Sequence, residues 1–530
     1  MKLQKARRLL GAILLVSAFV FEASGFTWAQ TRDSHPAPRK LQPAEEKGEL
    51  QLAAARRNPL QLRQFLKKMP KGADLHYHLG GGVYAESFLR AAAEDGLCVD
   101  VKRRAFAKCP ASDQESMNAE RNIVPAAEAY KNQELYDALV DSFSMRSFVP
   151  YAGVSGHDHF FDSFGKFGGT SPAHKAEWVD EAARRAAAQN EQYLELMETP
   201  DFSLADKIAA ETGWSEHLKA LRDSLLSRGL KENVTSAVAS LREIEQKRRG
   251  IEHCGQSDAA EACKVDARFI YQVLRGRSKE SVFAQTLLGF EAASADPERI
   301  VGVNFVMPED GYISMRDYAL HMRIVKFLHE TYPNVHITLH AGELAFGLVP
   351  PEGLCCHIRG AVEAGAERVG HGTDVMYEDR PHELLKEMAA RHVMVEINLT
   401  SNDVILGVKG DDHPLTMYRM FGVPVALSTD DEGVSRIDLT HEYVRAVETY
   451  GLQYAELKSM VRTGLEHAFL PGVSLWEKQD DFTKRNSACA KDVPGSEKLS
   501  STCAGFLKSS EKAQQQWELE RRFRAFEAEF

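Results

Sequence analysis

The chain has 530 residues, of which 44% are hydrophobic and 9% aromatic, and its 65 Lys and Arg against 76 Asp and Glu give a net charge of −11. This composition is typical of a folded globular protein, and it excludes the disordered and collagen-like classes. The negative charge argues against a nucleic-acid partner, because nucleic-acid binding depends on neutralising phosphates.

The N-terminus predicts a secretory signal peptide over residues 1–29. Basic residues at its start precede an apolar stretch from Leu9 to Val20, and small residues lead on to Ala29. The apolar stretch is about 12 residues long, whereas a bilayer span needs roughly 20, so a cleaved signal is favoured over an uncleaved anchor. No later segment is long and apolar enough for a span. We expect a secreted or periplasmic protein whose mature chain has no membrane span.

After the signal, residues 30–59 are polar and rich in proline, which predicts a tether leading into the first helix. Residues 60–475 alternate short apolar runs with amphipathic helical patterns, for example at 317–329 and 380–390. The candidate strands are 73–78, 193–198, 269–274, 300–306, 335–340, 368–371, 393–398 and 423–428. Strands alternating with helices favour a parallel sheet, and eight of them favour an α/β fold of the TIM type, a closed (β/α)8 barrel.

Export also affects the eight cysteines, because an oxidising compartment favours disulfides. Three pairs enclose short intervals rich in turn-forming residues, so we expect local disulfides between Cys98 and Cys109, Cys254 and Cys263, and Cys489 and Cys503. A thiolate zinc site is the alternative, although no C-x2-C pair is present. The adjacent residues Cys355 and Cys356 seldom bridge to each other, and their state stays open.

The cysteines also suggest where the barrel carries additional segments. We expect cysteine-bearing insertions near residues 95–130 and 230–266. Residues 476–530 are expected to form a C-terminal helical extension.

A barrel of this type carries its functional side chains at the carboxyl ends of its strands. The first candidate strand places Asp74, His76 and His78 on one face, because side chains alternate along a strand. Later strand ends carry His340 with Glu343, His371, Asn398, and Asp430 with Asp431. Each residue alone is more often a core or turn residue. Their shared position at one end of successive strands favours a functional site.

Two other patterns have competing explanations. A His-x-His pair is expected roughly once by chance in a chain with this histidine content, and the second such pair, His157 and His159, does not lie in a strand pattern. We assign that pair to a loop or a helix cap. The aromatic run Phe160, Phe161, Phe164 and Phe167 has helical spacing and fits either a lid over a substrate or core packing.

Three imidazoles and one carboxylate suit zinc, with nitrogen from His76, His78 and His340 and oxygen from Asp430. Zinc lowers the pKa of bound water and so provides a hydroxide nucleophile near neutral pH. Glu343 follows His340 closely enough to exchange a proton with a substrate, and His371 could orient the water.

Four motifs in this order resemble the adenosine deaminase family of metal-dependent hydrolases: His-x-His at 76–78, His-Ala-Gly-Glu at 340–343, Arg-Val-Gly-His-Gly at 368–372 and Ser-Thr-Asp-Asp at 428–431. The resemblance covers residues 69–471. The Met-Pro-Lys sequence at 69–71, the signal, the cysteine-bearing segment and a C-terminal helix with Trp517, Phe523 and Phe526 are similar to the secreted, adenosine-deaminase-related growth factor branch.

The resemblance implies hydrolytic deamination of adenosine or 2′-deoxyadenosine to inosine or 2′-deoxyinosine plus ammonia, with one zinc per chain. The implied zinc ligands are His76, His78, His340 and Asp430. Glu343 would protonate purine N1 as hydroxide adds to C6, His371 would hold the attacking water, and Asp431 would hydrogen-bond N7. The expected partner is therefore a small purine nucleoside; the sequence does not specify the oligomeric state.

The sequence also departs from the family pattern. Gly80 stands where cytosolic adenosine deaminases have an Asp that contacts the ribose, and the Asp-x-x-Gly whose amide faces purine N3 is missing from residues 304–310. Asn304 and Glu309 are candidates for part of that substrate-binding role. Two alternatives stay open: a deaminase of another 6-aminopurine or related heterocycle, and a secreted binding or signalling protein on a deaminase scaffold. Loss of a ligand or of Glu343 would favour the second, and none is lost.

Overall fold

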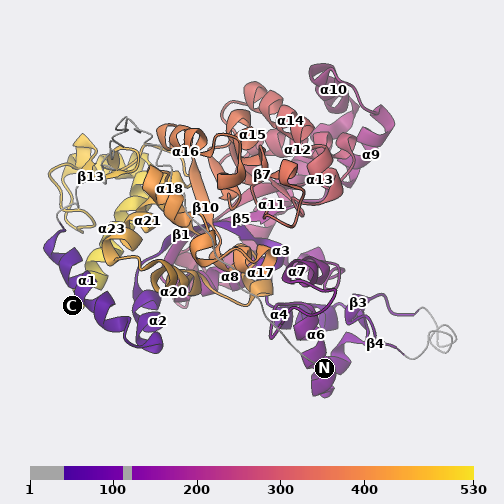
Figure 1. The fold of residues 1–530 in the computed structure, drawn as a ribbon, viewed down its shortest axis with the longest axis horizontal. Coiled ribbons are helices and arrows are strands. Elements are labelled where there is room, and N and C mark those ends of the chain that lie inside the picture. The colour runs from indigo at the N-terminus through magenta and orange to yellow at the C-terminus, as the bar shows by residue number, and fades with distance from the viewer. Residues whose placement is uncertain (1–40, 111–121) are drawn as a thin grey trace, which may run out of the picture. The chain divides into compact units, whose positions relative to one another are not determined.

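The computed structural model describes residues 41–110 and 122–530, and the expected signal peptide lies outside this part of the chain. Eight parallel strands form one sheet in which each strand pairs with the next along the chain (Figure 1). The strands are β1 (Gly72–His78), β5 (Glu191–Glu198), β6 (Asp266–Leu274), β7 (Ile300–Val306), β8 (His336–Ala341), β9 (Arg368–His371), β10 (Met394–Ile397) and β11 (Val425–Leu427). The eight strands expected from the sequence are confirmed.

Backbone hydrogen bonds from β1 to the residues that follow β11 close the sheet into a barrel. The amide of His78 donates to the carbonyl of Asp430 at 3.1 Å, and the amide of Asp430 donates to the carbonyl of His76 at 2.8 Å. The expected TIM-type barrel is therefore confirmed. Closure also brings Asp430 next to the two histidines of β1.

Helices surround the barrel, as Figure 1 shows, and include the two predicted near residues 317–329 and 380–390. The helices between the strands of the barrel and directly after β11 are α3 (Leu79–Gly82), α4 (Ala85–Glu94), α6 (Gln133–Ser142), α7 (Gly156–Phe164), α8 (Lys175–Ala188), α9 (Ser203–Thr212), α10 (Leu218–Leu225), α11 (Lys231–Ile251), α12 (Lys279–Ala295), α13 (Tyr312–Arg316), α14 (Tyr318–Thr331), α15 (His357–Ala364), α16 (Pro381–Ala390), α17 (Leu399–Leu406), α18 (Leu415–Phe421), α19 (Glu432–Ser435), α20 (Leu439–Tyr450) and α21 (Tyr454–His467). Because the helices cover the outer face, every residue of β1 and β5 is buried.

An ion-pair network inside the barrel joins three of its strands. Arg368 on β9 pairs with Glu195 on β5 and with Glu396 on β10, each at 2.6 Å, and all three side chains are fully buried. Buried charges are tolerated only when they are paired in this way. Glu396 has a second oxygen free for a histidine of β1.

The segments outside the repeated strand–helix pattern carry the disulfides. Between α4 and α6, a small antiparallel sheet contains β2 (Cys98–Asp100), β3 (Ala105–Ala107) and β4 (Ile123–Pro125). The stretch expected as a second insertion is mostly the long helix α11, which packs against α8 and α12. The predicted disulfides Cys98–Cys109, Cys254–Cys263 and Cys489–Cys503 are present, and Cys355 is bridged to Cys356.

The two ends of the described chain pack on the barrel. The polar tether expected at 30–59 is wrong for its second half, because α1 (Pro43–Ala55) and α2 (Pro59–Lys68) are helices, and α1 packs against α21. Pro43 is the first residue of α1, where the missing amide hydrogen costs no helical hydrogen bond. The C-terminal extension begins with a hairpin, β12 (Trp476–Lys478) and β13 (Asp481–Arg485), before the helices α22 (Ser501–Ser509) and α23 (Glu511–Glu527). Across residues 41–110 and 122–530, no helix is both long and apolar enough to cross a membrane.

Candidate metal centre and active site

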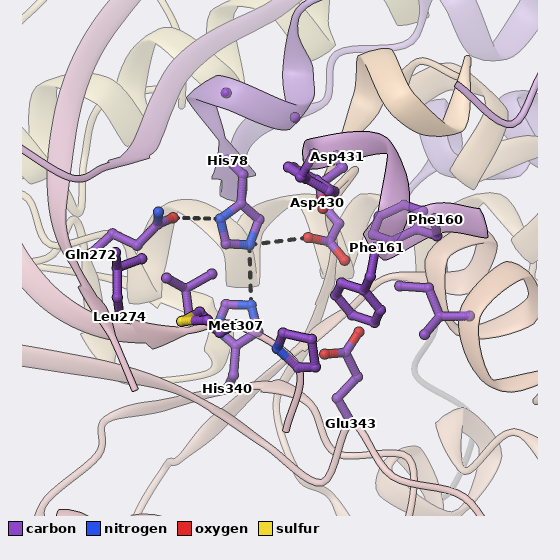
Figure 2. A pocket seen from close by; sticks show the side chains of 16 residues that line it. His78, Phe160, Phe161, Gln272, Leu274, Met307, His340, Glu343, Asp430 and Asp431 are labelled. Atoms are coloured by element: carbon purple, nitrogen blue, oxygen red, sulfur yellow. Dashed lines mark hydrogen bonds and ion pairs between the residues drawn. The ribbon is translucent and has the colours of Figure 1, made fainter. Parts of the chain in front are cut away.

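Four side chains predicted as ligands meet at the carboxyl end of the barrel. His340 Nε2 lies 3.1 Å from the Nε2 atoms of both His76 and His78. Asp430 Oδ1 lies 3.2 Å from His78 Nε2 and 3.5 Å from His76 Nε2. Figure 2 shows His78, His340 and Asp430 converging from three different strand ends. All four residues are buried.

The other ring nitrogen of each histidine is held by an acceptor. His76 Nδ1 donates to Glu396 Oε2 at 2.6 Å, His78 Nδ1 donates to Gln272 Oε1 at 2.6 Å, and His340 Nδ1 donates to Asn304 Oδ1 at 2.9 Å. With Nδ1 carrying the hydrogen, each Nε2 lone pair faces the centre of the group. This is the usual way in which proteins orient metal-binding histidines.

The donor set fits a metal ion. Four of the six separations between these atoms are 3.1–3.5 Å, close to the edges of a tetrahedron with bonds of about 2.0–2.1 Å to a central ion. Burial raises the pKa of the Asp430 carboxyl, but its interactions with the neighbouring rings of His76 and His78 outweigh this effect and hold the pKa well below its ordinary value. Asp430 is therefore an anionic oxygen ligand beside three imidazole nitrogens.

Glu343 and His371 flank the four predicted metal ligands, which together form the ligand group. The Glu343 carboxylate lies 3.7 Å from His371 Nδ1, and His371 Nε2 lies 3.7 Å from Asp430 Oδ2. Burial, and next the charge of Asp430, raises the pKa of Glu343 well above its ordinary value. Burial lowers the pKa of His371 to about 3. A carboxyl group whose environment favours the protonated form thus faces a neutral imidazole across the site.

A chain of hydrogen bonds fixes which nitrogen of His371 carries its hydrogen. The amide of Leu415 donates to His413 Nδ1 at 3.2 Å, so His413 Nε2 carries the hydrogen that it donates to Asn402 Oδ1 at 3.0 Å. The Asn402 amide nitrogen then donates to His371 Nδ1 at 2.9 Å. His371 Nε2 therefore carries the ring hydrogen, and this atom has no hydrogen-bond partner among the described residues.

The backbone at two of these positions is unusual. His371 and Asp430 adopt φ values of 71° and 64°. Residues other than glycine seldom adopt this left-handed conformation, and such backbone strain is concentrated at functional sites.

A cavity of about 370 Å³ opens directly above the ligand group. Its lining residues are His78, Gly80, Gly81, Phe160, Phe161, Phe164, Gln272, Leu274, Val306, Met307, Pro308, His340, Glu343, Ile405, Asp430 and Asp431. Figure 2 shows Phe160 and Phe161 on one side of the cavity and Leu274 and Met307 on the other. Phe167 instead stacks on Phe88 in the core, with ring centroids 4.4 Å apart. Three rings of the aromatic run thus line the cavity, and the fourth packs in the core.

Asp431 reaches the cavity because its neighbour after the adjacent strand β1 is a glycine. A Cβ atom on Gly81 would lie 1.5 Å from Asp431 Oδ1, so any larger residue would displace this carboxyl group. Burial raises the pKa of Asp431 to about 8. Its Oδ1 atom has no hydrogen-bond partner among the described residues.

The structure corrects the expected positions of Asn304 and Glu309. Neither side chain lines the cavity, because both form hydrogen bonds with residues behind it. Asn304 Oδ1 accepts from the amide and the ring of His340. Glu309 accepts from the amides of Gly342 and Glu343, at 3.1 and 2.8 Å, and from His357 Nδ1 at 2.5 Å. Both residues hold the end of β8 and the residues that follow it in place.

Other predicted features lie outside this centre. His157 and His159 are in α7, where His157 contacts Asp310 at 3.0 Å and His159 contacts the carbonyl of Ser144 at 3.1 Å. Both have structural partners. Neither residue caps the helix, because Ser155 does so.

Four residues that support the site were not identified from the sequence. They are Gln272, Glu396, Asn402 and His413. A charged residue inside a short buried strand was the available signal for Glu396. No local pattern marks Asn402 or His413, which meet His371 only in the folded chain.

The sequence model that describes the adenosine deaminase family matches residues 171–476, which is more than half of the chain. The adenosine deaminase of Shewanella loihica is 26% identical over 335 residues, covering 62% of this chain and 85% of that protein. The Escherichia coli adenosine deaminase is 40% identical over 136 residues, 26% of this chain and 38% of that protein. A solved structure of Arabidopsis ADAL complexed with GMP is 20% identical, covers 77% of this chain and 94% of that chain, and has a TM-score of 0.48. The chain belongs to the adenosine deaminase family.

Proposed function

We propose that this protein is a zinc-dependent hydrolase that converts adenosine or 2′-deoxyadenosine to the corresponding inosine and ammonia. The observation that carries the proposal is the arrangement at the bottom of the cavity. Three inward-facing imidazole nitrogens and the Asp430 carboxylate share one centre, and Glu343 and His371 face the same space. Membership of the family supports a metal-dependent deaminase reaction on a small purine.

The proposed zinc ligands are His76, His78, His340 and Asp430. Three histidines with one carboxylate suit zinc, because this borderline-soft ion accepts both nitrogen and oxygen ligands. When bound there, zinc would supply Lewis-acid activation of a water molecule, the nucleophile that this hydrolysis needs.

Glu343 is the proposed proton donor. Addition of a hydroxyl group to C6 of the purine places negative charge on N1, and a carboxylic acid beside N1 removes that charge by transferring its proton. Burial raises the pKa of Glu343, and this favours the protonated form that a proton donor needs. Glu309 fixes the position of this acid through the Glu343 amide.

His371 and Asp431 are the proposed orienting groups. The Nε2–H of His371 faces Asp430 and can hold the oxygen that adds to C6. Asp431 has an unpartnered oxygen at the cavity wall and can hydrogen-bond N7 of the heterocycle. Collapse of the C6 adduct then releases ammonia and leaves a 6-oxo purine.

We also propose that the chain is exported. The support is the signal-like N-terminal sequence together with four disulfides in the described residues, bonds that form in oxidising compartments. A secreted binding protein on the same scaffold would need none of the catalytic groups. The complete set at the cavity favours an enzyme.

The test is metal content and ammonia release from adenosine with the purified protein. We expect about one zinc per chain and expect His340→Ala to lose both zinc and activity. His217→Ala, at an exposed histidine, is the matched control and should retain both. Full activity after exhaustive chelation would contradict the proposal.

A further inference from the structure

The cavity is polar at its bottom and apolar at its mouth. The carboxyl-bearing lining residues Glu343, Asp430 and Asp431 and the histidines are buried. The apolar residues Phe161, Phe164, Leu274, Val306 and Pro308 are partly exposed, and Met307 is 37% exposed. Figure 2 shows Met307 and Leu274 across the cavity from Phe161.

Each polar side chain of the lining already has a hydrogen-bond partner or a role in the proposed function. His78, His340 and Asp430 belong to the ligand group, and Glu343 and Asp431 face the heterocycle in the proposed function. Gln272 accepts from His78 Nδ1 at 2.6 Å and donates to Thr199 Oγ1 at 3.0 Å. The remaining lining residues are glycines, prolines, aliphatic residues and aromatic residues.

The position of the reacting atom fixes where the sugar goes. C6 must lie at the ligand group, and N9, which carries the sugar, is at the opposite end of the purine. The sugar would therefore lie toward the mouth, among Phe161, Phe164, Leu274, Val306 and Met307. Burying a hydroxyl group there without a partner is unfavourable, whereas burying an apolar group is favourable.

The described lining offers no cationic side chain to bind a phosphate. Glu343, Asp430 and Asp431 are acidic, and no Lys or Arg lines the described cavity. A nucleoside monophosphate would bring its negative charge next to a wall that offers no cation and no free polar side chain.

We propose that the mouth of the cavity is an apolar sugar subsite, so that the enzyme also deaminates 6-aminopurine nucleosides whose sugar lacks the 5′-hydroxyl or carries an apolar 5′ group, and rejects nucleotides. The proposal rests on the proposed function. It goes beyond it by assigning a second class of substrate.

The experiment compares kcat/KM for adenosine, 5′-deoxyadenosine, 5′-deoxy-5′-methylthioadenosine and AMP on the zinc-loaded enzyme. We expect adenosine and 5′-deoxyadenosine to differ by less than about tenfold, which is 1.4 kcal/mol. The methylthio nucleoside should be at least as good as adenosine, and AMP should be worse by about 100-fold or more. A loss of about 100-fold on removing the 5′-hydroxyl, or AMP turnover equal to that of adenosine, would overturn the proposal.

Gly80, which lines the cavity, allows a variant that adds a polar side chain to the subsite. A Cβ on Gly80 meets no atom within 4 Å, so Gly80→Asn adds a donor and an acceptor to the subsite without a clash. We expect the preference for adenosine over 5′-deoxyadenosine to rise several-fold, because the hydroxyl gains a partner. Gly250→Asn, at an exposed glycine with equally open space, should leave the preference unchanged. An unchanged preference in Gly80→Asn would place the sugar elsewhere.

Binding measurements test the apolar sugar subsite separately from the proposed deamination reaction. Calorimetry on the zinc-loaded Glu343→Gln variant gives Kd ratios for the same four compounds without turnover. If no compound is deaminated by the wild type but the Kd ratios follow the expected order, the proposed function fails and the apolar subsite stands. If none of the nucleosides binds, the subsite proposal is overturned as well.

Discussion

Asn402 donates its amide hydrogen to His371 Nδ1 at 2.9 Å and thereby places the ring hydrogen of His371 on Nε2, facing the ligand group. The direction of this bond is set from outside the site, because His413 occupies the carbonyl oxygen of Asn402. A residue that does not line the cavity thus selects the tautomer of His371.

The Asn402→Asp variant tests this relationship. A carboxylate accepts from Nδ1, so it moves the ring hydrogen to Nδ1 and raises the pKa of His371 from about 3. We expect kcat to fall by at least about 100-fold, with KM and zinc content little changed. The acid limb of the residual pH profile should move to higher pH.

Asn334→Asp, at an exposed asparagine, controls for the added charge. A purely structural role for Asn402 would instead lower thermal stability and leave the shape of the pH profile unchanged. Wild-type kinetics in Asn402→Asp would show that His371 does not depend on this tautomer.

Gln272 orients His78 and should therefore affect the affinity for the metal. Gln272→Leu removes the acceptor at 2.6 Å from His78 Nδ1, so the ring is no longer held with its Nε2 lone pair inward. We expect zinc affinity to fall by about 10- to 100-fold, the usual effect of losing such a partner. Competition with a chelator of known affinity measures it. Thr199→Val removes only the second partner of Gln272 and should have a smaller effect; equal zinc affinity in all three proteins would disprove the role.

The strand-by-strand architecture could be predicted because each strand of this barrel is a short apolar run between amphipathic helices. The ligand group could be predicted for a related reason: all its members lie at the same ends of those strands. The partners of the ligands could not be predicted. Whether Gln272 meets His78, or Asn304 meets His340, depends on the register between neighbouring strands and on side-chain direction, which a local pattern does not contain. Pro43 was misinterpreted because proline is typical of both tethers and first helical turns.

His321 makes the stability of the fold sensitive to acid. Burial, and next the charge of Arg275, lowers the pKa of His321 from 6.5 to about 4. Between these two pH values the unfolded chain binds a proton that the folded chain does not, so the free energy of unfolding falls as the pH is lowered through this window. The contribution of one such group is at most about 1.4 kcal/mol per pH unit.

His321→Phe should flatten this dependence. Neither ring nitrogen of His321 has a hydrogen-bond partner among the described residues, and the ring packs against Phe305 with centroids 5.7 Å apart. Urea unfolding at pH 7 and pH 5 measures the effect. We expect equal or higher stability at pH 7 and a smaller loss at pH 5 than in the wild type. His217→Gln, at an exposed histidine, should behave as the wild type; an unchanged pH dependence in His321→Phe would assign the acid sensitivity to other groups.

The Cys489–Cys503 disulfide should stabilise the C-terminal segment. Both cysteines are fully buried in a small cluster with Leu475 and Trp517, and the bond joins residues 14 apart in sequence. On the chain-entropy model a loop of this length contributes about 3 kcal/mol. Replacing both cysteines by alanine should lower the unfolding free energy by about this amount, with kcat unchanged, because no residue of the cluster lines the cavity. A loss below about 0.5 kcal/mol would mean that packing alone holds the segment.

The measurement that tests the central claim most directly is ammonia release from adenosine by Glu343→Gln, with the zinc content of the same preparation. Glutamine keeps the shape of Glu343 and can occupy the same position beside N1, but it has no acidic proton to transfer. The account predicts wild-type zinc content and turnover reduced by at least about 100-fold. Turnover close to that of the wild type would contradict the assignment of Glu343 as the proton donor, and loss of zinc would show that Glu343 belongs to the metal site instead.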